Sequence, residues 1–258
     1  GEDAGATMPT LVGGERAGAL LSIGQKAGLK VDNDLNRSFV PTTPTIGLDD
    51  LSTSTDADLI LAPEYFPGLE TMWRIASSPI CRINDLKQYS RQSFENRCRV
   101  RNPDGWQWLT IPLQKLSLGT PVRNVLLEAN PGWRKRHLKG LRYNYSTSPY
   151  YEYYIDDLTE LIDSPSESLA ELTIASMKWT HKVLGIASSM HILSDSHEVD
   201  VTHCASELYH HPVYRQNFKG FFTGMSSLDL LFNHGPDSLN IFLTETNPDL
   251  MSKLVSVF

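Results

Sequence analysis

Cysteine is scarce in this sequence, and long apolar runs are absent. The three cysteines stand far apart, at positions 81, 98 and 204, so they make neither a disulfide framework nor a CxxC motif. No stretch approaches the roughly 20 consecutive apolar residues that a membrane span needs. The first residues also lack the basic start and the apolar segment of a signal peptide. We therefore expect reduced thiols, no transmembrane segment and a cytoplasmic location.

Tryptophan and tyrosine are missing from residues 1–57, which are rich in Gly, Ala, Thr, Ser and Asp. Each glycine weakens a helix by about 1 kcal/mol, and segments with little apolar content usually stay unfolded unless they dock. No internal repeat is present at a solenoid or propeller period. We predict a poorly structured N-terminal extension over residues 1–57 and one α/β domain over residues 58–258.

Acidic residues are few in one part of this acidic chain. Residues 82–142 contain thirteen basic and four acidic residues, a net charge of +9, although the whole chain carries −7. A basic segment inside an acidic protein favours a discrete anionic ligand. A solvated basic face is the alternative interpretation.

Short apolar segments near the start of the predicted domain indicate a parallel sheet. A buried strand at 59–61, helical spacing over 69–77 and a second strand over 79–83 make a βαβ unit. Ligands gather at the carboxyl ends of such strands, where residues 63–68 and 84–88 would lie. The predicted fold class is α/β: a mixed sheet opened by this βαβ unit, with a β-hairpin and flanking helices, in a single domain.

The hairpin is predicted from the turn Asn-Pro-Asp-Gly at 102–105. Pro103 presets φ at the second turn position, and Gly105 accepts the positive φ that follows. Before the turn, Arg97, Arg99 and Arg101 alternate with apolar residues, so the three guanidinium groups share one face of the strand. A core does not accommodate three such arginines, so we expect them to bind an anion. Salt bridges with the acidic remainder of the chain are the alternative.

Further elements are predicted from caps and periodicity. We expect a strand over 122–127 and a basic helix from 131–133 onward, whose N-terminus suits a phosphate or carboxylate. A buried helix is predicted over 164–185, with Ser164 as N-cap, Pro165 in the first turn and Gly185 after its end. A short helix follows Ser226, and another is expected over 237–243.

Two clusters of side chains leave their role open. Residues 143–154 contain six tyrosines. Their rings could form a platform on which a sugar or base stacks, or they could be loop residues that pack on the core. Histidine recurs over 191–211, and a zinc site could be drawn from His197, His203, Cys204 and His210. The spacings do not match structural zinc sites, so exposed loop histidines are the favoured reading and we predict no metal.

Five motifs resemble the WbqC-like protein family. In order along the chain they are YFP at 65–67, YSRQSFENR at 89–97, WLTIP at 108–112, WR at 133–134 and LDLLFNHGP at 228–236. The resemblance implies a bacterial protein of O-antigen-type, lipopolysaccharide or other surface-polysaccharide biosynthesis. It further implies modification of an amino sugar or glycan by acyl or aminoacyl transfer.

The leading hypothesis is a transferase that acts on a nucleotide-linked or lipid-linked sugar. Its expected partner is an anionic small molecule such as a nucleotide sugar or a sugar phosphate, and no cofactor is indicated. The predicted substrate-binding residues are Tyr65, Tyr89, Arg97, Arg99, Arg101, Trp108, Trp133 and Arg134. The arginines are included because a planar guanidinium group binds phosphate through two hydrogen bonds. The aromatic residues are included because they belong to the shared motifs. Asp85, at a strand end, is the predicted general base. Asn96 would orient the substrate.

Alternatives accompany each of these assignments. Asp85 would otherwise accept backbone N–H groups in a turn, and Asn96 would otherwise hold the hairpin. A non-catalytic scaffold that binds a glycan phosphate or a partner protein is the second hypothesis for the whole chain. It is favoured by Leu61, where many family members have a histidine, and by the short segment over 195–211. Nucleic-acid binding is disfavoured by the overall acidity and by the lack of a recognisable motif.

Overall fold

The parallel sheet begins with the predicted βαβ unit. Strand β1 (Leu59–Leu61), helix α2 (Leu69–Ala76) and strand β2 (Ile80–Ile83) follow one another, and β1 pairs with β2 in parallel. A third strand, β5 (Ser189–Ile192), pairs in parallel with β2, so the strand order is β1-β2-β5. The α/β class is thereby confirmed. The computed structural model describes residues 59–193 and 209–246, and the predicted extension over residues 1–57 lies outside this range.

The hairpin forms a second, two-stranded antiparallel sheet. Strand β3 (Arg97–Asn102) pairs with β4 (Gly105–Thr110), in a register that sets Arg99 opposite Trp108. Gly105 has φ +138°, as the turn sequence predicted. Cys98, Val100 and Leu109 are buried on the face opposite the arginines. In the described residues the hairpin is therefore a separate sheet rather than part of the parallel one.

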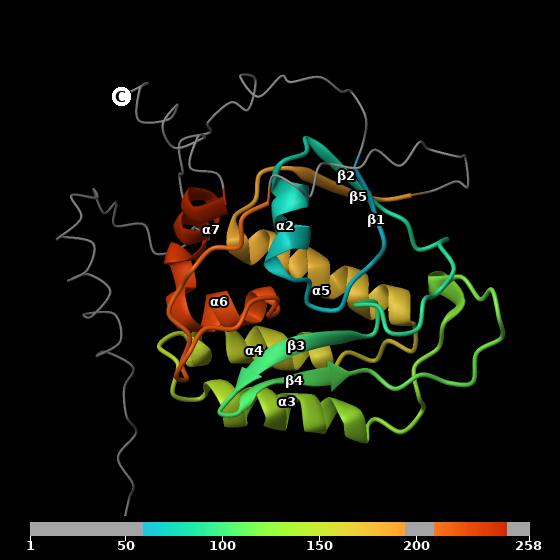
Figure 1. Ribbon diagram of the computed structural model, residues 1–258. Helices are drawn as coiled ribbons and strands as arrows, with labels where there is room; N and C mark the ends of the chain where they lie inside the picture. Colours follow the sequence, from blue (N-terminus) through green and yellow to red (C-terminus); the bar gives the residue numbers. More distant parts are fainter. Residues whose placement is uncertain (1–58, 194–208, 247–258) are drawn as a thin grey trace, which may run out of the picture. The chain divides into compact units, whose positions relative to one another are not determined.

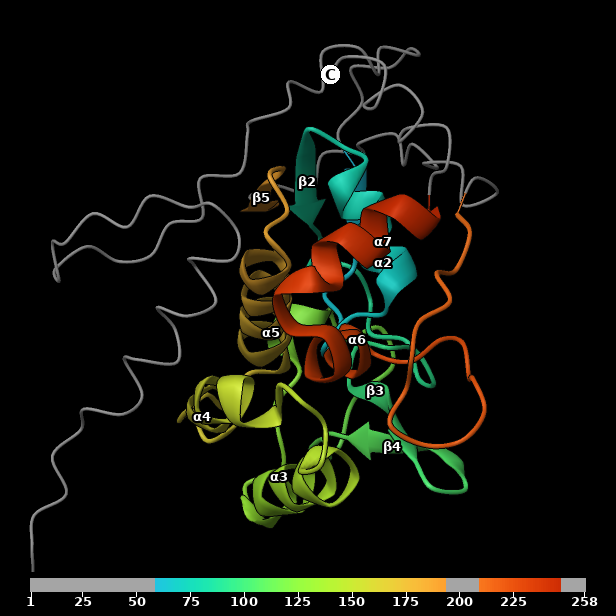
Figure 2. The same cartoon turned by 90° about the vertical axis from the view of Figure 1, so that its left-hand side faces the viewer.

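Helix α3 (Gly132–Tyr145) packs on the buried face of the hairpin. A Cβ placed on Gly140 would lie 3.2 Å from Leu109 and 3.3 Å from Gln107, so the glycine permits the close approach. Figures 1 and 2 show the hairpin beside α3, away from the three parallel strands. Helix α6 (Ser227–His234) contacts strand β3 and joins these two parts of the domain.

The predicted strand over residues 122–127 is wrong. Val122–Asn124 is one turn of 3-10 helix, and only single bridges follow, Leu126 with Ser168 and Leu113 with Leu127. The buried residues Val122, Val125 and Leu127 do not alternate. The backbone of this segment bonds to three different segments, at residues 85–87, 114 and 167–169, instead of to one strand, so a ladder cannot form.

The tyrosine-rich segment comprises the end of α3, a turn and the start of the next helix. Helix α4 (Tyr151–Ile162) buries Tyr151, Tyr154, Leu158 and Ile162, which recur at helical spacing. Tyr143 and Tyr153 are exposed. Most of these rings therefore pack in the core, as one of the two interpretations held.

Helix α5 (Leu169–Leu184) starts later than predicted. Its N-cap is Ser168, whose side chain accepts from the Glu171 N–H, and not Ser164. Residues just before the helix stay extended because Leu127 N–H donates to the Glu167 carbonyl and Ser168 bridges Leu126. The predicted end is confirmed: Gly185 has φ +70°.

The last two helices match their start and stop signals. The Ser226 side chain caps α6 by accepting from the Leu228 N–H. Helix α7 (Ser238–Thr246) follows after a single 3-10 turn at Gly235–Asp237. Leu228, Leu231 and Phe232 are fully or almost fully buried, so α6 lies in the core.

Candidate functional site

Two loops meet at the carboxyl ends of β1 and β2. The loop of residues 62–68 follows β1, and the loop of residues 84–96 follows β2. Tyr65 N–H donates to the Phe94 carbonyl at 3.0 Å, and Asn84 N–H donates to the Leu61 carbonyl at 2.7 Å. Parallel α/β sheets bind ligands at this edge. We call the two loops together the sheet-edge site.

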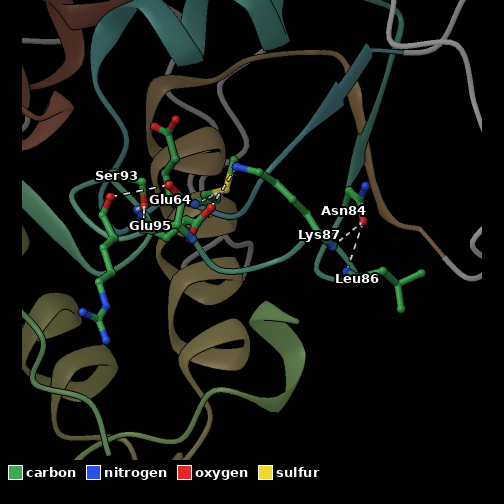
Figure 3. A network of polar contacts seen from close by, with 9 residues as sticks. Glu64, Asn84, Leu86, Lys87, Ser93 and Glu95 are labelled. Carbon is green, nitrogen blue, oxygen red and sulfur yellow. Dashed lines mark hydrogen bonds and ion pairs between the residues drawn. The ribbon is translucent and has the colours of Figure 1, made fainter. Parts of the chain in front are cut away.

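The loop after β2 is held by side chains that the sequence did not single out. The Asn84 carboxamide oxygen accepts from the backbone N–H groups of Leu86 and Lys87 (Figure 3). The Lys87 ammonium pairs with Glu95 at 3.0 Å, and the other Glu95 oxygen accepts from Ser90 N–H. Glu95 is 1% exposed, so this half-exposed lysine balances a buried carboxylate. Figure 3 shows that Lys87 and Glu95 come from opposite ends of the loop.

Glu64 is the titratable group of the loop after β1. Its carboxylate accepts from the Thr71 hydroxyl at 2.9 Å. Burial raises the pKa of Glu64 to about 7, against the opposing effects of the Thr71 hydrogen bond and of Arg74. A carboxyl group with a pKa near neutrality at a sheet edge is a candidate proton-transfer residue.

Asp85, the predicted general base, is engaged in an ion pair. Arg123 donates to its carboxylate at 2.8 Å, and the Arg123 N–H also donates to the Asp85 carbonyl. These contacts tie the end of β2 to the 3-10 turn at Val122–Asn124. The structure gives Asp85 a structural partner, and its catalytic role stays a prediction.

Asn96 holds the base of the hairpin. Its carboxamide donates to the Ile111 carbonyl at 2.9 Å, and the Ile111 N–H donates back to the Asn96 carbonyl. These bonds extend the hairpin pairing by one residue pair. A role for Asn96 in orienting substrate is not tested by these contacts.

Arg97 and Arg99 lie on an aromatic surface of the hairpin. The Arg97 guanidinium stands 4.2 Å from the centre of the Trp108 ring, and that of Arg99 stands 4.5 Å from Trp106 and 4.9 Å from Trp108. Phe94 packs against Trp108 at 5.9 Å. Phe94 and Trp106 are 42% and 39% exposed. We call these five residues the arginine–aromatic surface.

The two arginines differ in their hydrogen bonds. Arg97 donates to the carbonyls of Gln92 and Ser93, which fixes the loop before β3. The Nε of Arg99 is buried, and no group in residues 59–193 and 209–246 hydrogen-bonds to it. A buried N–H donor without a partner is costly unless a ligand or water satisfies it, although the rest of the Arg99 side chain is partly exposed. Arg99 is therefore the stronger anion-binding candidate of the two.

Arg101 lies in the core, unlike the other two arginines. It is 0% exposed, and four of its N–H groups donate to the side chain of Gln216 and to the carbonyls of Asn102, Gly105 and Lys219. The Phe222 ring covers the guanidinium at 4.4 Å. The side chain of Arg101 is on the same face of the strand as those of Arg97 and Arg99, but the loop at 216–222 covers it. The core therefore accommodates one of the three arginines that the sequence places on this face.

Tyr65 is completely buried and bonds to a buried histidine. The Thr110 carbonyl can only accept, so His137 Nε2 donates to it, and Nδ1 then accepts from the Tyr65 hydroxyl at 3.0 Å. Burial lowers the pKa of His137 to about 4, which keeps the ring neutral. The structure places Tyr65 beneath the sheet-edge site and not on its surface.

Tyr89 lies in the loop after β2, with its side chain partly exposed. Burial and the charge of Glu95 raise the pKa of its hydroxyl, while Arg97 and Arg91 lower it. Tyr89 and Trp108 are thus the predicted aromatic substrate-binding residues that the structure leaves accessible near Glu95 and Arg97.

Trp133 and Arg134 belong to a different region. Trp133 is 1% exposed, and the Arg134 guanidinium stacks on its ring at 4.6 Å. Arg134 also donates to the carbonyls of Ile162 and Ser166. These contacts hold the start of α3 against the end of α4. None of them involves the arginines of the hairpin.

Asp229, in the last shared motif, is a buried acceptor that the sequence did not assign to a site. It accepts from the hydroxyls of Tyr145 and Tyr214 at 2.8 and 2.9 Å. Burial raises the pKa of Asp229, and the hydrogen bonds of both tyrosines lower it. The Tyr145 hydroxyl also accepts from Arg101 N–H. These contacts join α6 to the hairpin. They give Asp229 of this motif a role in stabilising the fold.

No cluster of metal-binding side chains occurs in residues 59–193 and 209–246. Of the histidine cluster, His197, His203 and Cys204 lie outside the described residues. His211 donates to the Pro212 carbonyl and accepts from Gly224 N–H, which makes it part of the loop scaffold. No helix of the described part is long and apolar enough to cross a membrane.

Fold and edge loops together define an α/β protein with polar loops at the carboxyl end of a small parallel sheet. The profile of the WbqC-like protein family matches residues 62–209 and 202–241, so this chain belongs to that family. The motif resemblance in the sequence is thereby confirmed. The chain is similar to uncharacterized protein Rv1507c of Mycobacterium tuberculosis, with 26% identity over 198 residues that cover 60% of this chain and 84% of that protein. No solved structure matches the chain.

Proposed function

We propose that this protein binds a nucleotide-linked or phosphorylated sugar at the sheet-edge site and modifies it as a cytoplasmic transferase of bacterial surface-polysaccharide biosynthesis. Membership in the WbqC-like family supports the biological setting. The arginine–aromatic surface supports the ligand class, because guanidinium groups bind phosphate and exposed rings stack on sugars or bases.

One observation carries the proposal: the Arg99 guanidinium stands over two neighbouring tryptophan rings and has a buried Nε that no described group satisfies. Neighbouring Arg97 uses Nε and one further nitrogen for carbonyls and keeps the other for a ligand. Phe94 and Trp106 stay exposed beside them. Structural arginines in this domain, such as Arg101, instead satisfy their donors with protein carbonyls.

A thermal-shift screen against nucleotide sugars, sugar phosphates and acyl-CoA species tests the proposal, since a bound ligand raises apparent stability. Calorimetry on a positive ligand should then show that Arg99→Ala weakens binding by about 10- to 100-fold, the value of one or two charge-assisted hydrogen bonds. Arg142→Ala, which removes an exposed arginine of α3, is the matched control and should leave affinity unchanged. Equal affinity in both variants, or no ligand at all, would reject the proposal.

A non-catalytic binding protein is the second candidate function. The ion pair of Asp85 with Arg123 favours it, because the predicted general base is already occupied. The two candidates separate in a turnover assay with the ligand found in the screen. Product formation that Arg99→Ala abolishes identifies the transferase, whereas tight binding without turnover identifies the scaffold.

A further inference from the structure

Glu64 is positioned by contacts from three directions. Its N–H donates to the Met177 sulfur at 3.2 Å, and its carbonyl accepts from the Ser176 hydroxyl at 3.2 Å, both on α5. The next residue, Tyr65, is tied to the Phe94 carbonyl across the sheet-edge site. A side chain whose backbone is fixed in this way is held in a defined place.

The two carboxylate oxygens of Glu64 have different surroundings. Oε2 accepts from the Thr71 hydroxyl of α2 at 2.9 Å. Oε1 has no hydrogen bond in the described part of the chain, and the side chain is partly exposed. Glu95 of the neighbouring loop lies within electrostatic range of Glu64. One oxygen therefore orients the group while the other is open to a ligand.

The charges around Glu64 come from two elements. Helix α2 contributes Arg74 and Glu70, and the loop after β2 contributes Glu95, which Lys87 neutralises. Burial is the largest influence, and with these charges it brings the pKa of Glu64 to about 7. Both the protonated and the ionised form are thus populated at neutral pH, which suits transfer of a proton in either direction.

We propose that Glu64 is the acid–base residue of the sheet-edge site and exchanges a proton, through Oε1, with a hydroxyl or amino group of the bound sugar. The ligand O–H or N–H bond breaks as the carboxyl O–H bond forms, and the reverse step returns the proton. This inference rests on the proposed function for its ligand. Glu64 takes the proton-transfer role that the sequence assigned to Asp85, because the Asp85 carboxylate is paired with Arg123.

The first test needs no ligand. Carbon-13 NMR of the full chain labelled at the glutamate carboxyl carbons should show one signal that titrates near pH 7 and disappears in Glu64→Gln. Glu128→Gln, at an exposed position, is the control and should keep that signal. Titration of Glu64 near its ordinary pKa of 4.5 would overturn the inference whatever the protein binds.

The second test measures protons taken up on binding of glucose 1-phosphate or UDP-glucose, by calorimetry at pH 7 in two buffers of different ionisation enthalpy. A bound phosphate favours the protonated carboxyl, so wild type should take up as much as about half a proton per ligand. Glu64→Gln should bind the same probe with no proton uptake, and Glu128→Gln should match wild type. Binding with unchanged uptake in Glu64→Gln overturns this inference alone. Absence of binding by wild type overturns the proposed function and this role of Glu64 with it.

Discussion

Three arginines of one strand have different fates because their surroundings differ. Arg97 and Arg99 lie on tryptophan rings at a partly exposed surface, whereas Arg101 is enclosed by the loop at 216–222. The guanidinium of Arg101 donates hydrogen bonds to carbonyls of the hairpin turn and of that loop. Its charge therefore serves the connection between the hairpin and that loop.

Replacement of Arg101 by methionine should be strongly destabilising. Methionine fills a similar volume but leaves the carbonyls of Gly105 and Lys219 without their guanidinium donors, while Gln216 keeps only the N–H of Phe222. Each orphaned buried group costs about 1–3 kcal/mol, so we expect a loss of about 3–5 kcal/mol in the free energy of unfolding, measured with urea. Arg142→Met, at an exposed position of α3, should change stability by less than about 0.5 kcal/mol. A loss below about 1 kcal/mol for Arg101→Met would show that water replaces the guanidinium.

The junction of helices α6 and α7 depends on one glycine. Gly235 has φ +54°, and a Cβ at this position would lie 2.3 Å from the Tyr150 ring. Tyr150 N–H donates to the Phe232 carbonyl, which fixes the Tyr150 backbone against α6. The Gly-Pro stop signal in the sequence thus also reflects a steric requirement that no local pattern reveals.

Gly235→Ala should lower the free energy of unfolding by about 2–4 kcal/mol, from backbone strain and from overpacking. Gly119→Ala separates the two effects, because Gly119 has φ +84° but no atom within 4 Å of the added Cβ. That control should lose only about 1 kcal/mol. Removal of the ring with Tyr150→Ala should reduce the extra cost of Gly235→Ala in a double-mutant cycle. Equal losses at Gly235 and Gly119 would contradict a clash.

At the scale of the whole molecule, two of the described groups make opposite contributions to the dependence of stability on pH. The pKa of Glu64 rises from 4.5 to about 7 on folding, so the native state retains a proton and stability falls as pH rises through this window. The pKa of His137 falls from 6.5 to about 4, so stability falls as pH drops from 6.5 towards 4. Each contribution is about 2–3 kcal/mol, and between pH 4.5 and 6.5 they largely cancel.

Glu64→Gln should unmask the contribution of His137. Relative to wild type, the variant should gain about 2–3 kcal/mol at pH 8 and little at pH 4.5, so its melting temperature should drop steeply on acidification. Thermal unfolding of both proteins at several pH values between 4.5 and 8 measures the difference between their stabilities. The contributions of the other titrating groups are the same in both proteins and cancel in this difference. The Glu128→Gln curve should run parallel to wild type. A Glu64→Gln curve parallel to wild type would show that Glu64 titrates normally.

The local elements could largely be predicted from the sequence. The strands at 59–61 and 80–83, the Asn-Pro-Asp-Gly turn and the glycine after α5 rest on contacts between residues close in the chain. Where a distant partner competes, prediction from local pattern failed. Ser164 has the right spacing for a cap, but pairing of residues 167–168 with 126–127 keeps that segment out of the helix.

What the sequence by itself determined is the βαβ unit, the hairpin with its alternating arginines, and membership in the WbqC-like family. Only the tertiary structure decided which charged groups of this chain are available to a ligand. Asp85 pairs with an arginine 38 positions away, and Arg101 donates to a carbonyl 118 positions away. Burial and pairing depend on such distant neighbours, whereas periodicity and turn chemistry are properties of adjacent residues.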